Sequence, residues 1–469
     1  MNRVSLKFMH TWVGLGSRFL PFADVATADL PLGRLLRLSM FQVTVGMALV
    51  LLVGTLNRVM IVELDVPASL VGIMISLPLL FAPFRALIGF KSDTHQSALG
   101  WRRVPFIFRG TMVQFGGLAI MPFALLVLSG GGESARYPVW VGQVGAGVAF
   151  LLVGAGLHTV QTIGLALATD LAPPESQPKV VGLMYVMLLL GMIVSAVAFG
   201  AALHDFSPLR LIQVIQACAV ITLVLNAVAA WKQEGRHAAR RNPARVQPTF
   251  RESWDSFAQG GHAVRRLLAV GFGTMGFSMA DVLLEPYGGQ ILGLSVGATT
   301  SLTATLAGGG LVGLALASHV LGRGANPFRM ARYGVMAGLP AFMLVMAAAP
   351  YNAPAFFAVG TLMVGFGAGL FGHGTLTATM NLAPRSQVGL ALGAWGAAQA
   401  VAAGLAIALG GVIRDVVAHS PVESRYGDAT GYLCVYALEI ILLIWTLVVM
   451  APLMRKSEQG AAGNSGALS

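Results

Sequence analysis

The sequence predicts an all-α integral membrane protein with twelve transmembrane helices in two six-helix halves. Of its 469 residues, 56% are hydrophobic and only 10% are charged, whereas about a quarter of the residues in a soluble globular protein are charged. The apolar runs are continuous and long enough to cross a bilayer as helices, and they lack the alternation that is typical of a membrane barrel. A polar, arginine-rich segment at 232–263 divides these runs into two similar groups.

Residues 1–38 precede the first span and are predicted to form an amphipathic cytoplasmic segment. Phe8, Trp12 and Phe19 lie near one face of a helical projection, with basic residues between them. A helix that lies in the membrane interface fits this pattern, and so does a solvated leader. Two prolines would interrupt any longer helix.

Each apolar run that follows is long enough for one crossing. We expect a first six-helix half at 39–231, a basic cytoplasmic linker at 232–263 and a second six-helix half at 264–454. Residues 455–469 are rich in Gly, Ala and Ser and are predicted to be a disordered tail. The predicted spans are approximately 39–62, 67–90, 104–129, 138–170, 176–203, 208–231, 264–291, 296–322, 328–349, 353–381, 386–413 and 430–454.

The net charge of +11 is distributed in a way that indicates membrane orientation rather than nucleic-acid binding. Most of the 30 Lys and Arg residues fall in the linker, near the ends of the chain and in alternate loops. Because basic loops remain on the cytoplasmic side, the linker and both termini are predicted to be cytoplasmic. Cys218 and Cys434 lie inside apolar runs without metal-ligand spacing, so we predict no metal site.

An internal repeat supports the division into two halves. Gly154-Ala-Gly-Leu lies in the fourth predicted span, which ends with Ala168-Thr-Asp-Leu-Ala-Pro173. Gly367-Ala-Gly-Leu lies likewise in the tenth span, which ends with Ala378-Thr-Met-Asn-Leu-Ala-Pro384. Parallel halves joined by a cytoplasmic linker are the architecture of the major facilitator superfamily, which the sequence resembles in span number, charge pattern and repeat.

The loop between the second and third spans contains an acid and paired arginines. It reads Gly89-Phe-Lys-Ser-Asp93 and, after a gap, Gly100-Trp-Arg102-Arg103, which resembles a Gly-x-x-x-Asp…Gly-x-Arg-Arg motif of facilitators with a longer gap. An acid near a helix end beside two arginines can hold neighbouring helices together, so Asp93, Arg102 and Arg103 are predicted to form a loop latch. Positive-inside anchoring by the two arginines is the alternative.

The presence of charged groups within the spans must be explained, because a charge near the bilayer centre costs about 2.5–3.5 kcal/mol. Asp281 and Glu285 are four residues apart and share a helix face, and Pro286 breaks the backbone ladder beside them. Arg58 lies at a similar depth in the first span. We predict an interhelical charge pair between Arg58 and Glu285 or Asp281 that closes the outer side. Snorkelling of all three side chains to the interface is the alternative.

Several other ionisable side chains lie in the spans or at their ends. Asp170 is interpreted as an ordinary helix-end group, and Glu439 as a deep acid that is protonated or hydrogen-bonded. Neutral imidazoles can ligate a chlorin-bound magnesium, so His373, His158 and His319 are candidate pigment ligands, although a lone buried histidine is more often a hydrogen-bonded core residue. His373 is the most suggestive, because glycines flank it; they could admit a flat macrocycle or serve close helix packing.

Several longer motifs are similar to those of one family of facilitators. Two of them are Gly54-Thr-Leu-Asn-Arg-Val-Met-Ile-Val-Glu-Leu64 and Asp281-Val-Leu-Leu-Glu-Pro-Tyr-Gly-Gly289. The others lie at 35–43, at 81–89, and at 92–95 with 100–103. Together they resemble the PucC/LhaA family, the bacteriochlorophyll-delivery branch of the major facilitators in purple phototrophic bacteria, over essentially the whole chain.

The resemblance implies a light-harvesting antenna assembly factor rather than an enzyme. Such a factor would deliver bacteriochlorophyll to the antenna α and β polypeptides, with the pigment's synthase as a further partner, in the intracytoplasmic photosynthetic membrane. The motifs at 182–190 and 231–234 slightly favour the peripheral antenna over the core antenna. The resemblance assigns no magnesium ligand to a residue of this chain.

Two other functions fit the residues. A proton-coupled transporter of a small solute would use Asp281, Glu285 or Asp170 as proton carriers, and a pigment or lipid flippase would merge with the assembly role. The scarcity of polar residues in the spans disfavours sugar-like solutes. Catalysis is not predicted, because the sequence contains no Walker-type loop, nucleophile elbow or His-Glu-x-x-His motif.

Overall fold

The computed structural model describes residues 31–80, 88, 91–92, 101–173, 176–234, 263–382 and 388–465. Within these residues every regular element is a helix, and eleven helices are long and apolar enough to cross a membrane. A shorter apolar helix begins at Ala68, where the second span is predicted, and residues 81–87 of that span lie outside the described part. The structure confirms the predicted all-α membrane fold.

The first half begins with one long span. Its α-helical part, α3 (Leu32–Leu49), continues through two π-helical segments, η1 (Val50–Leu56) and η2 (Val59–Glu63). This span starts earlier than the predicted residue 39, because Pro31 forms an extended N-cap and Leu35 and Leu38 are buried in the core. The other elements of this half are α4 (Ala68–Leu80), α6 (Val104–Leu128), η3 (Gly132–Arg136), α7 (Val139–Leu171), α8 (Gln177–Ala202) and α9 (Pro208–Ala230).

The second half begins with a broken span and ends with an extended helix. The broken span consists of α11 (Ala263–Ser278), the 3-10 turn η4 (Met279–Val282) and α12 (Leu284–Gln290). The elements that follow are α13 (Val296–Gly322), α14 (Pro327–Ala348), α15 (Pro354–Leu382), α16 (Val388–Ala418), α17 (Pro421–Tyr426) and α18 (Thr430–Ser465). Helix α18 extends to Ser465 and so includes most of the segment at 455–469 that the sequence predicts to be a disordered tail.

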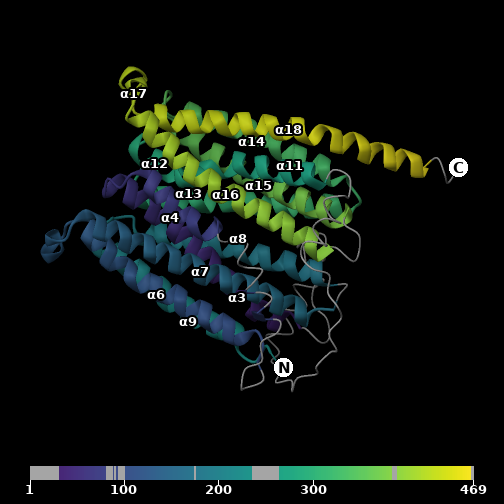
Figure 1. Cartoon of the computed structure of the whole chain (residues 1–469), viewed down its shortest axis with the longest axis horizontal. Coiled ribbons are helices and arrows are strands. Elements are labelled where there is room, and N and C mark those ends of the chain that lie inside the picture. The colour runs from purple at the N-terminus through teal and green to yellow at the C-terminus, as the bar shows by residue number, and fades with distance from the viewer. Residues whose placement is uncertain are drawn as a thin grey trace.

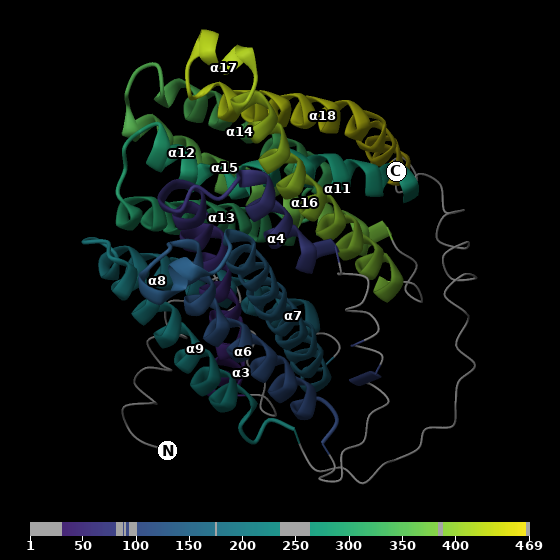
Figure 2. The same cartoon turned by 60° about the vertical axis from the view of Figure 1, so that its left-hand side comes forward.

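The long helices lie side by side, with α3 to α9 in one group and α11 to α18 in the other (Figures 1 and 2). We call the end of the bundle at which α9 ends and α11 begins the linker end, and the opposite end, where α17 lies, the far end (Figure 1). The two halves pack together through α4 with α16 and α8 with α13.

The contacts between the halves are close near the far end. A methyl group placed on Gly200 of α8 would lie 2.9 Å from the carbonyl oxygen of Gly297 on α13. In the other helix pair, Asp415 of α16 accepts a hydrogen bond of 2.7 Å from the backbone N–H of Ser69, in the first turn of α4. Small residues and a helix-end hydrogen bond therefore hold the two halves together at this end.

Glycines also let α13 and α15 approach each other closely within the second half. A methyl group on Gly309 would lie 2.0 Å from the carbonyl oxygen of Leu362, and one on Gly365 would lie 2.0 Å from that of Leu306. Van der Waals contact between backbones is a main source of helix association in membranes, and only small residues permit it. Gly308, next to Gly309, has no atom within 4 Å of its added methyl.

Replacement of Gly309 by alanine should therefore destabilise the protein. The new methyl group would meet backbone atoms, and overpacking of this kind costs about 1–3 kcal/mol. Thermal unfolding of the purified protein in detergent should show a lower midpoint for Gly309→Ala. Gly308→Ala is the matched control and should keep or raise the midpoint, because alanine favours the helix by about 1 kcal/mol over glycine. Equal midpoints for the two variants would contradict this packing.

Candidate functional site

A cavity of about 370 Å³ lies between the two halves. From the first half it is lined by α8, and from the second by the broken span, α13, α15 and α16. Its walls are mostly apolar, and it lies on the linker side of the far-end contacts. The polar and ionisable side chains that line it are Tyr185, Ser278, Asp281, His373, Trp395 and Gln399.

A larger cavity, of about 630 Å³, lies within the first half alone, between α6 and α9. Its lining includes no histidine and no residue of the second half. Ligands of facilitator-type folds bind between the two repeats. The cavity between the halves is therefore the candidate functional site, although it is the smaller of the two.

The break in the seventh span places Asp281 at this cavity. Pro286 has no backbone N–H, so the carbonyl of Val282, four residues earlier, has no helical partner. The side-chain amide of Asn57, from the first half, lies 3.4 Å from that oxygen. Asp281 lies on the 3-10 turn just before these groups, and it lines the cavity.

Glu439 of α18 supports the same break from the other side. Its side chain is fully buried, and Oε1 accepts a hydrogen bond of 2.7 Å from the backbone N–H of Ala280. Glu439 was expected to be protonated or hydrogen-bonded, and the structure confirms that it is hydrogen-bonded. A deep acid that the sequence left unexplained thus positions the turn that carries Asp281.

His373 contributes an imidazole to the cavity from α15. Within the part of the chain that the structure describes, this ring has no hydrogen-bond partner. Gly372 beside it is open, since the atom nearest to a methyl group placed there is Nε2 of Gln399 at 4.0 Å. Gly365 and Gly369 instead pack against α13. Gly374, on the other side of His373, packs against the backbone of Ala331 on α14. Close helix packing therefore accounts for Gly365, Gly369 and Gly374, and Gly372 borders open space.

The other two candidate histidines lie elsewhere. His158 lies on α7, is half-buried and already has an interaction partner. His319 lies near the linker end of α13 and is exposed. The structure does not bring the three histidines together, and among the described residues no cluster of three His, Cys, Asp or Glu side chains could hold a metal ion. His373 alone of the three lines the cavity.

The predicted pairing of Arg58 with Glu285 or Asp281 is wrong in this structure. The Arg58 guanidinium forms its ion pair with Glu63, on its own span. Glu285 accepts a hydrogen bond of 2.9 Å from Oγ1 of Thr303, and Asp281 faces the cavity. The reason is the local helix winding: a π-helix bonds residues five apart, which places Glu63 on the side of the helix that carries Arg58.

Arg58 nevertheless connects the two halves. Its Nη2 donates a hydrogen bond of 3.2 Å to the backbone carbonyl of Leu294, which precedes α13. A methyl group on Gly289 would lie 2.9 Å from the same nitrogen, so the guanidinium lies directly against the backbone of α12. Arg58 thus contacts the second half through a carbonyl group rather than through the predicted carboxylate.

The paired arginines of the predicted loop latch contact an acid at the end of the fourth span. Arg102 Nη2 lies 2.8 Å and Arg103 Nε 3.0 Å from the same carboxylate oxygen of Asp170. Asp170 is therefore more than the ordinary helix-end group that the sequence suggests. Asp93, the acid predicted for the latch, lies outside the described residues.

Glu234 is a member of this cluster that sequence analysis missed. Its carboxylate accepts hydrogen bonds of 2.8 to 3.0 Å from the backbone N–H groups of Arg102, Arg103 and Val104. These groups lie at the N-terminus of α6, where the helix leaves donors unpaired and favours negative charge. The sequence could have indicated this contact, because Glu234 is the first acid after the sixth span and lies on the same side of the membrane as the arginines.

Comparison with known proteins identifies relatives over most of the chain. A family model described as PUCC protein matches residues 55–458. Protein PucC of Rhodovulum sulfidophilum is 64% identical over 89% of this chain and 92% of that protein, and protein PucC of Cereibacter sphaeroides is 60% identical over 95% and 97%. A solved D-xylose–proton symporter aligns with a TM-score of 0.68 at 13% identity, over 88% of this chain and 96% of the symporter. That likeness shows the major-facilitator fold.

We expect energetic coupling between Arg58 and Glu63, and little between Arg58 and Glu285. In a double-mutant cycle with Arg58→Met and Glu63→Gln, the coupling free energy should be about 0.5–1 kcal/mol, because one partner is partly exposed. The free energy of unfolding can be measured by denaturant titration in mixed micelles. The same cycle with Glu285→Gln is the control and should be additive within about 0.5 kcal/mol. Stronger coupling to Glu285 would restore the pair across the halves.

Proposed function

The chain belongs to the PucC family, and we propose that it is an assembly factor for light-harvesting antennae that delivers bacteriochlorophyll to antenna α and β polypeptides. The solved structures that share its fold include a transporter, the D-xylose–proton symporter, and we propose a handover of pigment with no chemical change to it. The peripheral antenna is the favoured client, and the synthase that makes the pigment is the favoured donor.

The observation that carries this proposal is the environment of His373. Its imidazole lines an apolar cavity between the halves and has open space beside it at Gly372. A neutral imidazole nitrogen is a good metal ligand, and the magnesium of a chlorin needs an axial ligand of this kind. The cavity, at about 370 Å³, lies at the lower end of the usual range for small-molecule sites, about 300–1,000 Å³, so it would take part of the macrocycle and leave the rest of the pigment outside. We assign His373 the role of holding the pigment by its magnesium.

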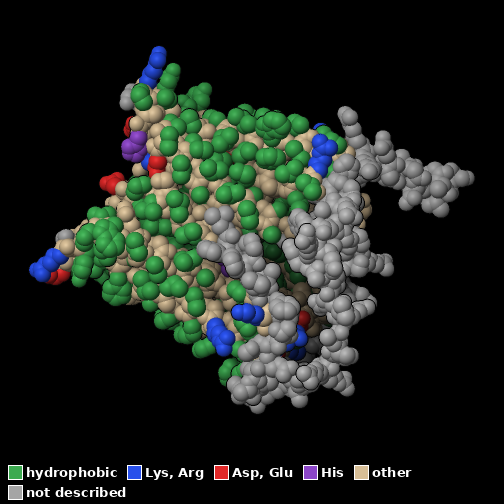
Figure 3. Space-filling model, viewed as in Figure 1, with side chains coloured by type: hydrophobic (Ala, Val, Ile, Leu, Met, Phe, Trp, Pro, Cys, Tyr) green, Lys and Arg blue, Asp and Glu red, His purple; other side chains and the backbone are tan. Residues whose placement is uncertain are grey.

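The outer surface of the protein suits clients that are single apolar helices. On the face that Figure 3 shows, hydrophobic side chains are spread along the bundle, and the charged side chains lie mainly near its two ends. Phe123 of α6 and Val224 of α9 are among the exposed apolar residues. Helices in a bilayer associate by packing and hydrogen bonding rather than by a hydrophobic driving force, so such a surface can hold an antenna polypeptide loosely and release it.

One observation favours proton-coupled transport as a second function. Asp281 and His373 both line the cavity, and two titratable groups at a midmembrane site are typical of proton relays. Of the three proton carriers predicted from the sequence, only Asp281 lines the cavity, since Glu285 bonds Thr303 and Asp170 bonds the arginines of the loop. A pigment flippase would use the same cavity and merges with the first proposal.

Bacteriochlorophyll should co-purify with the protein, and replacement of His373 should release it. We expect a near-infrared absorption band in the protein purified in mild detergent from a pigment-producing host, together with antenna polypeptides. His373→Leu should lower the pigment bound per protein by about tenfold or more, the scale on which metal-site substitutions act.

His319→Leu is the matched control, because this histidine is exposed and does not line the cavity; it should retain the pigment. Asp281→Asn tests the alternative, since it should abolish proton-coupled uptake and leave the pigment band intact if His373 holds the pigment. A colourless wild-type preparation without antenna polypeptides would reject the assembly role.

We propose that the protein lies in the photosynthetic inner membrane with its linker end in the cytoplasm. The basic residues at that end support this orientation. Alkaline phosphatase, which is active only in the periplasm, should be inactive when fused after Glu234 and active when inserted near Arg425 in α17. The reverse pattern of activities would overturn the orientation.

A further inference from the structure

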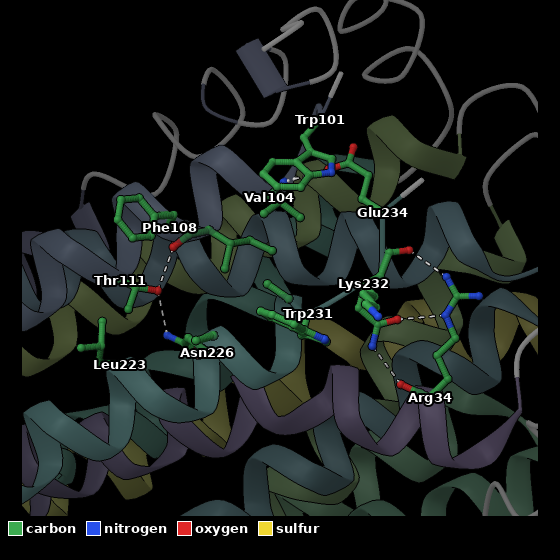
Figure 4. Close-up of a pocket in the computed structure, with 14 residues that line it drawn as sticks. Arg34, Trp101, Val104, Phe108, Thr111, Leu223, Asn226, Trp231, Lys232 and Glu234 are labelled. Atoms are coloured by element: carbon green, nitrogen blue, oxygen red, sulfur yellow. Dashed lines mark hydrogen bonds between the residues drawn. The ribbon is translucent and has the colours of Figure 1, made fainter. Parts of the chain in front are cut away.

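A second cavity lies in the first half, near the linker end. It has a volume of about 630 Å³ and is formed by α3, α6 and α9 (Figure 4). Asn226 and Thr111 form a polar pair in its wall, with Nδ2 of Asn226 donating a hydrogen bond of 3.0 Å to Oγ1 of Thr111. The apolar side chains that line it are Trp101, Val104, Ile107, Phe108, Leu223 and Trp231, with Ala227 and Ala230.

The cavity is open on the lipid-facing side of the bundle. Phe108 of α6 and Trp231, just after α9, line it and are 61% and 63% exposed. Ala227 is exposed as well. Because the neighbouring faces of α6 and α9 carry further exposed apolar residues, a molecule can reach this cavity from the bilayer without passing between the two halves.

The rim at the linker end is positively charged. Lys232 is exposed, and Arg34 is held by the neutral Gln233, with its Nε 3.1 Å from Oε1 and its Nη2 2.7 Å from the backbone oxygen (Figure 4). The acid of the rim, Glu234, is directed to the backbone N–H groups at the start of α6. Its carboxylate bonds these amides, and in the described part of the chain no acid contacts Lys232 or Arg34, so both positive charges can attract an anion.

We propose that this cavity binds an anionic glycerophospholipid from the bilayer leaflet at the linker end. An acyl chain fits between Phe108 and Leu223, while the phosphate group lies at Lys232 and Arg34. Tryptophan is enriched at the level of lipid headgroups, which is where Trp231 would then lie. Basic residues near a membrane surface attract anionic lipids, by about five-fold in affinity for each residue. The proposal shares no residue with the central cavity and is independent of the pigment proposal.

The test is native mass spectrometry of the full chain in detergent, titrated with phosphatidylglycerol or with phosphatidylcholine of the same acyl chains. Phosphatidylglycerol should bind more tightly. Lys232→Glu should weaken its binding by about five-fold or more and have little effect on phosphatidylcholine. Ala227→Trp, which fills the cavity from its exposed side, should weaken both lipids.

Two matched variants control for general effects of charge and bulk. Arg332→Glu reverses an exposed basic residue on α14, and Ala217→Trp enlarges an exposed alanine on α9 outside the cavity; neither should alter lipid binding. Equal binding of the two lipids, or equal losses in the cavity and control variants, would overturn the proposal. Displacement of the lipid by glycerol 3-phosphate alone would show a headgroup site and refute the acyl-chain assignment.

Discussion

The bundle depends on how a helix that breaks inside the membrane keeps its backbone hydrogen-bonded. The bilayer core holds no water to satisfy an exposed amide or carbonyl, so the break between α11 and α12 persists only because other spans reach it. Asn57 of the first half approaches the Val282 carbonyl, and Glu439 accepts a hydrogen bond from the amide of Ala280. Stabilising the break therefore also ties the first half of the protein to the second.

The break separates the closed end of the molecule from its cavity. On the far side, Arg58 lies against α12 and bonds the carbonyl of Leu294. On the linker side, Asp281 and His373 line the space between the halves. Because Gly200 and its neighbours close the far end, a ligand of the cavity is expected to enter from the linker end or from the bilayer. The break that Pro286 accompanies thus lies between the tightly packed end of the protein and the cavity.

The sequence predicted the spans well because hydropathy depends on composition rather than on packing. The sequence could not predict the partner of Arg58, because the pairing with Glu63 depends on a π-helical winding that no residue pattern predicts. The contacts of Arg102 with Asp170 and with Glu234 join residues 68 and 132 positions apart, which only tertiary packing brings together. The glycines beside His373 made it a candidate pigment ligand from the sequence alone. Only the structure could show that it, rather than His158 or His319, lines the cavity.

The cap that Glu234 forms on α6 has a mechanical consequence. Glu234 is the first acid after α9 and lies at the start of the polar linker at 232–263, so tension in the linker would act on this cap of α6. Loss of its three hydrogen bonds would expose the unpaired amides of α6 and weaken the hold on Arg102 and Arg103, beside Asp170. The linker is thus attached to the start of α6 as well as to the end of α9, so a pull on it would act on two helices of the first half.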